Sequence, residues 1–554
     1  MEPVVPRAAP AAHSGAMPFI PAFLLIALPW LNPFAPGPSP AAVPLLFSWA
    51  CAAGLLALCC RLTSRDFCTR VVTAAAWAWL AAGLLSAAMG LCQYLGAGAS
   101  LLPWVNQTQL GEAFGNLRQR NQFATLTNIA LAALLWLVAS GRLDGRRAGP
   151  PQARPAPSGG SDPHEVGERG GNVRRRAGLA WIAAVLLMAG NAASSSRTGL
   201  LEMLLLGALA WLWGGWREKV IRRVLLAALL GYAVAALLLP WLAGFGWFGN
   251  DALVRLREGD QLCASRLTLW SNVLQLIALH PWRGWGWGQL AYAQYITLFD
   301  GPHFCAILDN AHDLPLHLAV TLGVPAALAL CGGFTWWVWR QRPWREADPM
   351  RRMAWAVLAV IALHSLLEYP LWYGPFQIAA GLCLAWLWMT ARPQERASNR
   401  PQTLSSTTQT AIVSVVMLVL AGLAYAAWDY HRVSQIYLVP EQRDAAYRTD
   451  TLAKVSDSWL FHNPAAFARL TLTELTPENA PRLRALALHL LHYSPEPRVI
   501  EKLIAADLLL GRQDDAQFQL ARFRAAFPTD CADWTAEHAR LLQPLPAGAP
   551  RPSR

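Results

Sequence analysis

Charged side chains are scarce in this sequence. Only 14% of its 554 residues are Asp, Glu, Lys or Arg, whereas 55% are hydrophobic. Average soluble proteins carry about 25% charged residues, so the composition argues against an ordinary water-soluble enzyme. Apolar runs of about 20 residues, the length that crosses a bilayer, recur along the chain. We therefore predict an all-α polytopic membrane protein with about eleven transmembrane helices, or twelve as the alternative count, at residues 18–33, 41–60, 71–95, 122–140, 178–193, 199–216, 224–245, 314–339, 353–368, 371–390 and 409–428.

Polar residues are also rare in the middle of the predicted spans and gather at their outer ends. A transporter or lipid flippase needs polar or charged side chains at mid-membrane in several spans, because these line the path of the cargo. The distribution argues against that class.

The net charge of +12 follows an orientation pattern. If Met1 is cytoplasmic, the inside segments carry 24 Lys and Arg residues and the outside loops carry 7. Cytoplasmic loops are enriched in Lys and Arg, so we expect a cytoplasmic N-terminus and, after eleven spans, a C-terminus outside. The charge then reflects topology rather than a nucleic-acid-binding surface.

Cysteine is sparse outside the predicted spans. Of ten cysteines, seven lie in or beside spans, where Cys behaves as a small hydrophobic residue. Cys263 and Cys305 share the largest outer loop, which would be oxidising in a bacterial envelope. We predict a disulfide between these two.

The large outer loop, residues 246–313, is the first candidate for a functional site. Connections longer than about 12–15 residues usually carry function or are disordered, and this loop is too rich in Trp, Leu and Gly for disorder. It contains Arg266, which suits anions, and His312, which titrates near neutral pH. Residues 266–280 show a helical apolar stripe that suits a membrane surface, and Asn310 and Asp313 flank His312.

Two further polar segments lie at the outer ends of spans. Residues 118–122 hold Arg118, Gln119, Arg120 and Asn121 before an apolar helix; they either anchor the helix at the interface or bind an anion at its N-terminus. Ser196 and Arg197 precede Glu202 by about one turn. Arg197 and Glu202 either pair with each other or form a phosphate-binding site in which the carboxylate of Glu202 orients Arg197.

The segment HSLLEYPLWYGPF contributes His364, Glu368 and Tyr373. His364 and Glu368 stand four apart, so they share a helix face, and Pro370 ends the helix. They form either a structural hydrogen-bonded pair or a functional pair, which would bind the molecule that accepts a transferred group or would exchange a proton.

Two regions differ from the membrane part, which we take as residues 1–428. Residues 141–177 are rich in Pro, Gly and Arg, and we expect a disordered cytoplasmic linker. Residues 429–554 contain amphipathic helices with a weak tetratricopeptide-type match, and we expect a small helical domain outside the membrane, with a disordered tail from about Gly548.

Together the motifs SRTG, SRLTLW, PWRGWGWG and DNAHDLPLHLAVTLGVPAAL resemble the bacterial O-antigen ligase and polymerase superfamily. GNLRQRNQFATL, HSLLEYPLWYGPF and the C-terminal helical domain resemble its protein O-oligosaccharyltransferase branch, which glycosylates pilins. Many relatives have Asn where this chain has Asp313.

The resemblance implies an inner-membrane enzyme that transfers a whole oligosaccharide from undecaprenyl-pyrophosphate to a Ser or Thr hydroxyl of a periplasmic or pilin-type protein, without a metal or another cofactor. We expect Arg197 and Arg266 to stabilise the pyrophosphate, with Arg118 or Arg120 as a third group. His312, oriented by Asp309 or Asp313, would act as the base, or else only position the donor. An O-antigen ligase acting on lipid A–core sugar and an O-antigen polymerase are the alternative functions.

Overall fold

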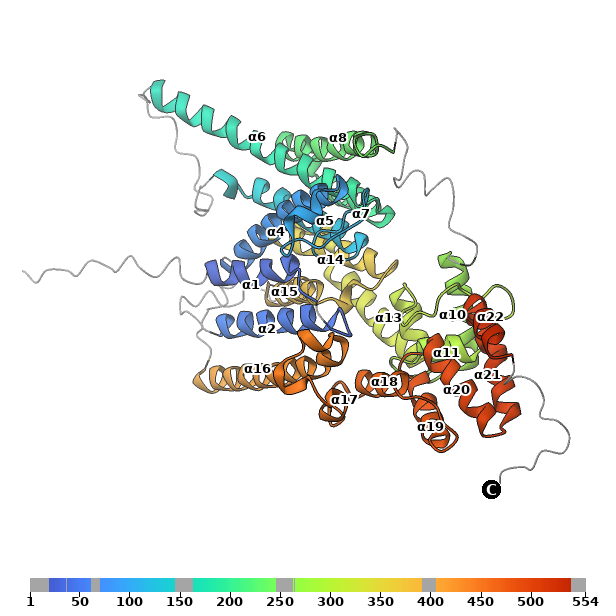
Figure 1. The fold of residues 1–554 in the computed structure, drawn as a ribbon. Coiled ribbons are helices and arrows are strands. Elements are labelled where there is room, and N and C mark those ends of the chain that lie inside the picture. The colour runs from blue at the N-terminus through green and yellow to red at the C-terminus, as the bar shows by residue number, and fades with distance from the viewer. Residues whose placement is uncertain are drawn as a thin grey trace, which may run out of the picture.

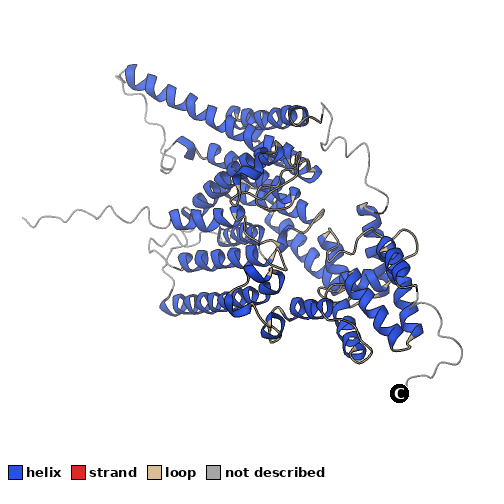
Figure 2. Ribbon diagram, in the orientation of Figure 1, coloured by secondary structure: helices blue, strands red, loops and turns tan. Residues whose placement is uncertain are grey.

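The computed structural model describes residues 19–35, 37–60, 70–144, 163–245, 263, 265–390 and 405–539. Within these ranges the chain is helical and contains no strand, as Figure 2 shows. The predicted all-α class is therefore confirmed for the described residues. Residues 246–262 of the large loop and the expected tail from Gly548 lie outside them.

Each predicted span coincides with helical structure. The helices are α1 (Phe19–Leu31), α2 (Ala42–Cys59), α4 (Val72–Tyr94), α5 (Arg120–Ala139), α6 (Pro163–Ala193), α7 (Arg197–Leu212), α8 (Lys219–Leu242), α12 (Leu314–Leu322), α13 (Val324–Gln341), α14 (Pro349–Ser365), α15 (Gly374–Thr390) and α16 (Ser406–Ser434). Five of the described helices are long and apolar enough to cross a membrane, namely α2, α4, α5, α8 and α16 with its 3-10 extension to Tyr437. The chain is thus consistent with a polytopic bacterial membrane protein, while the count of eleven stays a prediction.

The linker prediction is wrong in part. Helix α6 begins at Pro163, so residues 163–177 continue the apolar helix of residues 178–193 backwards. Extending an existing helix adds one hydrogen bond per residue without a new nucleation step, which a composition argument overlooks. Residues 145–162 of the expected linker lie outside the described residues.

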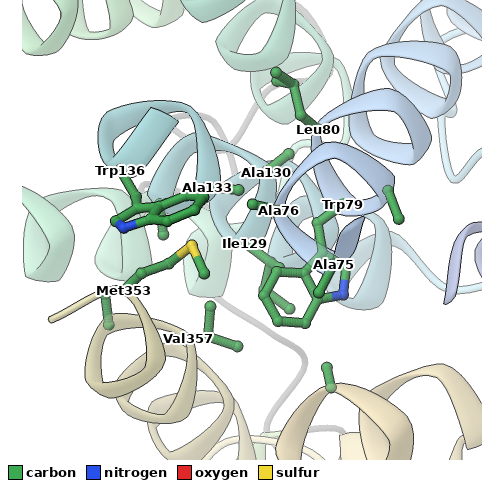
Figure 3. Close-up of a cluster of buried hydrophobic side chains, with 14 of the residues drawn as sticks. Ala75, Ala76, Trp79, Leu80, Ile129, Ala130, Ala133, Trp136, Met353 and Val357 are labelled. Carbon is green, nitrogen blue, oxygen red and sulfur yellow. The ribbon is translucent and has the colours of Figure 1, made fainter. Parts of the chain in front are cut away.

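Helix α5 forms the centre of the membrane part, and its residues 121–134 are all buried. It contacts α4, α6, α7 and α14 (Figure 1). Figure 3 shows its Trp136 and Ile129 packed with Met353 and Trp79 from neighbouring helices. Small residues let the backbones approach: a Cβ on Gly199 of α7 would lie 2.4 Å from the Ala124 side chain in the first turns of α5. The N-termini of α5 and α7 are therefore held side by side.

The predicted span 314–339 is broken at Gly323, where the backbone adopts φ +90°. The PWRGWGWG segment fills the break. The N–H groups of Trp285 and Gly286 donate to the carbonyls of Val320 and Thr321 at 2.8 and 3.0 Å. Gly284 lies so close that a Cβ there would be 2.5 Å from the Thr321 backbone. The glycines of this motif thus allow backbone contact that fixes α12 beneath the large loop.

The large loop contains α10 (Arg266–Leu279) and α11 (Leu290–Ile296). Leu269, Val273 and Leu276 of α10 are buried in a cluster shared with α11 and α12, whereas Leu267 is 75% exposed. The predicted helix is confirmed. It was expected on the membrane surface, but one face of it packs inside the protein. Cys263 and Cys305 form a disulfide, as predicted.

The C-terminal part is a stack of consecutive short helices: α17 (Thr451–Lys454), α18 (His462–Leu472), α19 (Ala480–Leu491), α20 (Pro497–Leu509), α21 (Gln513–Ala526) and α22 (Pro528–Glu537). It has its own hydrophobic core and packs against α11 of the large loop (Figure 1). Tyr295 is buried in that core, and its hydroxyl donates to Gln519 at 2.7 Å. Arg522 donates to the carbonyl of Ile296 at 2.7 Å. The C-terminal helices are thus fixed to the large loop.

Short 3-10 helices complete the described chain: η2 (Ala97–Leu101), η3 (Arg142–Asp144), η4 (Gly215–Arg217), η6 (Pro343–Arg345), η7 (Pro370–Trp372), η8 (Gln435–Tyr437), η9 (Pro440–Gln442) and η10 (Ala445–Tyr447).

Candidate active site

The carboxylate of Glu368 is the centre of the candidate site. It lies beyond the end of α14, in the turn before η7, and its side chain is 8% exposed. One carboxylate oxygen accepts from the Arg266 guanidinium and from Asn121 Nδ2, the latter at 3.0 Å. The other oxygen lies 2.7 Å from His312 Nδ1. The structure therefore brings together three predicted residues from separate parts of the chain.

The local backbone sets the position of His312. This residue adopts φ +53°, a conformation that is uncommon for non-glycine residues. Asn310 stabilises the turn, because its Oδ1 accepts from the His312 N–H at 2.9 Å. The Tyr369 ring lies edge-on to the imidazole at 5.0 Å. Such strained conformations concentrate at functional sites, and the side chain, 21% exposed, stays accessible.

The ionised carboxylate of Glu368 determines which ring nitrogen of His312 carries a proton. Burial raises the pKa of the Glu368 carboxyl, but the His312 hydrogen bond and the charges of His312 and Arg266 outweigh it, so the pKa is lowered overall. A carboxylate only accepts hydrogen bonds. His312 Nδ1 must therefore carry a proton in this contact, and Nε2 is the ring nitrogen that does not face Glu368. That nitrogen can act as a base.

Glu368, rather than Asp309 or Asp313, orients His312. Asp313, which was expected to orient His312, caps α12, since its Oδ1 accepts from the Leu316 N–H at 2.8 Å. Burial raises the pKa of the Asp313 carboxyl. The sequence predicted a carboxylate partner for His312 but assigned it to near neighbours.

A cavity of about 350 Å³ opens beside Glu368. Its lining includes Arg118, Gln119, Arg120 and Asn121, together with Ser194, Ser195 and residues 111–114. Gln119 caps α5 by accepting from the Gln122 N–H at 2.8 Å. Arg118 also donates to the carbonyl of Pro33, so it anchors the loop as well as lining the cavity; burial lowers its pKa. Arg120 lies 4.0 Å from Glu112.

Three helices that meet at the site begin with an arginine. These first residues are Arg120 of α5, Arg197 of α7 and Arg266 of α10. A helix N-terminus carries roughly half a positive charge and free N–H groups. Each arginine therefore adds its own positive charge to that of the helix end. Ser196 joins two of the helices, since its hydroxyl caps α7 and donates to Asn121 Oδ1 at 2.7 Å. The arrangement suits an anion of high charge.

A second polar cluster lies deeper, around Thr125. The Thr125 hydroxyl is 2.6 Å from Glu202 Oε1 and 2.8 Å from His364 Nδ1. Asn128 donates to the other Glu202 oxygen at 2.9 Å. Glu202 and His364 are fully buried, so α5, α7 and α14 are joined through one threonine. The oxygens of Glu202 are thus bound by α5 side chains.

The side chains of His364 and Glu368 have different partners, Thr125 and His312, although the Glu368 N–H donates to the His364 carbonyl at 2.8 Å. Helix α14 ends at Ser365, and the turn directs Glu368 to His312 while His364 stays on the helix beside Thr125. Tyr373 stacks on Tyr369 at 5.9 Å, and Tyr369 in turn lies edge-on to His312.

Sequence reasoning missed Tyr369, Thr125 and Asn128 as members of these clusters. A signal was present for two of them: Asn121, Thr125 and Asn128 repeat at intervals of four and three, which places them on one face of α5. Tyr369 had no such signal, because its contact with His312 depends on the tertiary fold.

Three segments of the chain match known families. Residues 182–331 match the family described as O-antigen ligase, and residues 352–542 match virulence factor membrane-bound polymerase, C-terminal. Residues 113–138 match protein glycosylation ligase. These segments contain all of Arg118, Arg197, Arg266, His312 and Glu368.

A general O-oligosaccharyltransferase of Acinetobacter baylyi is 22% identical over 277 residues. That match covers 47% of this chain and 46% of the relative, so it spans about half the length of each. No solved structure matches the chain significantly.

Proposed function

This chain resembles the O-antigen ligase superfamily and its protein glycosylation ligase branch, and we propose that it transfers an oligosaccharide en bloc from undecaprenyl-pyrophosphate to Ser or Thr hydroxyls of a periplasmic or pilin-type protein. The site then lies on the periplasmic side of the inner membrane, with a cytoplasmic N-terminus and a periplasmic C-terminal domain. The distribution of Lys and Arg supports this orientation.

The observation that carries the proposal is the Glu368 cluster at the rim of the arginine-lined cavity. Glu368 holds His312 and Arg266 together, and the cavity of about 350 Å³ adjoins this carboxylate. A base and a concentration of guanidinium groups are what a hydroxyl nucleophile and a pyrophosphate leaving group require.

The chemistry follows from these positions. His312 Nε2 accepts the proton of the acceptor hydroxyl while its oxygen attacks the anomeric carbon of the donor sugar. The bond from that carbon to the pyrophosphate oxygen breaks, and its electron pair goes to the leaving group. Arg266 and Arg197, with Arg118 or Arg120, stabilise the added charge through paired N–H donors. Attack opposite the leaving group inverts the anomeric centre.

The main alternative is an O-antigen ligase that transfers glycan to lipid A–core. The family match over residues 182–331 favours it, because that segment includes Arg197, Arg266 and His312. The protein glycosylation ligase match over residues 113–138 and the oligosaccharyltransferase relative favour a protein acceptor. A polymerase would need the same donor chemistry with a second lipid-linked glycan as acceptor.

Expression in a host that lacks its own ligase tests the three functions together. The host supplies one lipid-linked glycan and one candidate pilin. Glycan on the pilin supports the proposal, whereas glycan on lipid A–core or a ladder of longer lipid-linked chains contradicts it. His312→Ala, which removes the base, is the inactive control in each case.

A further inference from the structure

The C-terminal domain contains a groove of about 660 Å³ that is separate from the candidate active site. It lies between α18, α20 and α22. Its apolar surface comes from Leu475, Ala505, Leu509 and the buried Trp534. Nothing in the proposed chemistry uses this groove.

One wall of the groove is acidic. Asp530, Asp533 and Glu537 line it from α22 on either side of Trp534, at helical spacings of three and four. Glu501 of α20 also lines it. Burial and then the charge of Asp530 raise the pKa of the Glu501 carboxyl, and Glu537 adds to the rise, while His538 and Arg498 partly oppose it. The groove therefore concentrates negative charge next to an apolar floor.

These acids differ from the buried carboxylate elsewhere in the same domain. Asp507 is nearly buried and pairs with Arg484, while Asp515 pairs with Arg512 at 2.6 Å. Among the described residues, none of the four groove acids forms an ion pair.

The cations of the groove do not neutralise its acidic wall. Lys502 donates to the carbonyl of Thr473 at 2.9 Å. Arg498 and His538 are the other basic residues of the lining, so four carboxylates face two side chains with a permanent positive charge. The four carboxylates thus remain available to a partner, and complementary charge steers association and sets specificity.

We propose that this groove binds an extended polypeptide segment in which Lys or Arg side chains flank an apolar residue. The apolar residue contacts Trp534 and Leu509, and the cationic side chains pair with Asp530, Asp533 and Glu537. Because the domain is fixed to the large loop through Tyr295 and Arg522, a polypeptide held there stays close to the loop that carries the candidate site. That this polypeptide is the glycan acceptor rests on the proposed function.

Direct binding tests the groove without any glycan. The probe is a fluorescein-labelled peptide, Gly-Lys-Leu-Lys-Gly-Lys-Leu-Lys-Gly, added to the full-length protein in an uncharged detergent. A second peptide with Glu at every Lys position is the matched probe. We expect the Lys peptide to bind and the Glu peptide not to bind, with the affinity for the Lys peptide falling as salt rises.

Two matched double variants distinguish binding in the groove from attraction to the overall charge of the protein. Asp533→Lys with Glu537→Lys should weaken binding of the Lys peptide at least tenfold. Glu478→Lys with Asp514→Lys makes the same change of charge at exposed positions outside the groove lining and should leave binding within twofold of the unaltered protein. Equal binding by both double variants, or no binding of the Lys peptide to the unaltered protein, would overturn the proposal.

A kinetic comparison tests the link to the acceptor. With an unmodified acceptor protein as the varied substrate, the groove variant should raise KM at least tenfold and leave kcat unchanged, because it alters docking and not the reacting groups. An unchanged KM would mean that the acceptor does not use the groove. If the unaltered protein transfers no glycan, the proposed function fails, while the peptide-binding result still decides the groove.

Discussion

Glu368 receives hydrogen bonds from three partners, and its replacement by glutamine removes the charge while keeping the shape. An amide at this position offers a single acceptor oxygen, so it cannot serve Arg266, Asn121 and His312 together. We expect Glu368→Gln to reduce the rate of glycan transfer by at least about 10²-fold, since the base is no longer held in one tautomer. Transfer by purified protein measures this, with thermal unfolding as the control for folding. A rate close to that of the unaltered protein would show that His312 needs no carboxylate.

Arg266 and lysine differ in geometry rather than charge. The guanidinium of Arg266 binds Glu368, a carboxylate that lines the cavity. Lysine supplies one charged centre that cannot contact two oxygens with fixed geometry. We expect both Arg266→Lys and Arg266→Ala to lose most of the transfer activity, while membrane insertion stays normal. Recovery of full activity by lysine would mean that charge alone suffices at position 266.

The sequence predicted which residues gather, but not all of their pairings. Arg266, His312 and Asn121 were expected at one site from their types and from their places at the ends of spans. The partner of His312 was sought among its neighbours, whereas Glu368 is 56 residues away. The reason is the end of α14 at Ser365, before the position that apolar periodicity predicts. A helix end of this kind depends on tertiary contacts that a single sequence does not display.

Three helices are joined through Thr125, and this junction can be tested through Glu202. The side chain of Glu202 is fully buried and bonds to Thr125 and Asn128. Glu202→Leu removes one hydrogen bond from Thr125 and one from Asn128, which keep their contacts with His364 and with the Gly199 carbonyl. Each lost hydrogen bond costs about 0.5–1.5 kcal/mol. We expect a clearly lower unfolding temperature for Glu202→Leu and a smaller change for Glu202→Gln, which keeps the oxygen and the shape. Equal unfolding temperatures for the two variants would contradict a role for this junction in stability.

Helix positions were easier to predict than helix breaks. Apolar length located each membrane helix, because burial in lipid demands long apolar runs. The break at Gly323 was not predicted, because a single glycine inside an apolar run is compatible with a continuous helix. What makes the break possible is the distant PWRGWGWG segment, whose N–H groups bond the carbonyls of Val320 and Thr321. Such compensation between segments is not visible in local patterns.

At the scale of the whole molecule, the C-terminal domain is attached to the large loop through Tyr295. This side chain is 1% exposed and packs into the core of the C-terminal domain. Truncation of a large buried aromatic costs about 3–5 kcal/mol. We expect Tyr295→Ala to release the domain, which limited proteolysis would detect as faster cleavage between the domain and the membrane part, and to lower transfer. Tyr295→Phe, which loses only the hydrogen bond to Gln519, should behave nearly normally; equal cleavage of both variants would contradict this attachment.

The class of the molecule was predictable from composition, whereas the attachment of its two parts was not. Scarce charge and recurring apolar runs indicated a helical membrane protein, and the rise in charge after residue 428 indicated a separate helical region. Tyr295 carries no sign in the sequence that it enters a core formed by residues beyond 460. Contacts of that kind depend on shape complementarity between folded surfaces.

The bond between Cys263 and Cys305 makes this protein dependent on the redox machinery of its cell. Cys263 precedes the helix that Arg266 begins, and Cys305 precedes the turn of His312, so one covalent bond links the two segments that carry these residues of the candidate site. Cells keep thiols reduced in the cytosol and oxidise them only in compartments outside it. If the proposed function holds, a bacterium deprived of its thiol-oxidising enzymes would accumulate the protein with these two segments unlinked, and its acceptor protein would carry less glycan.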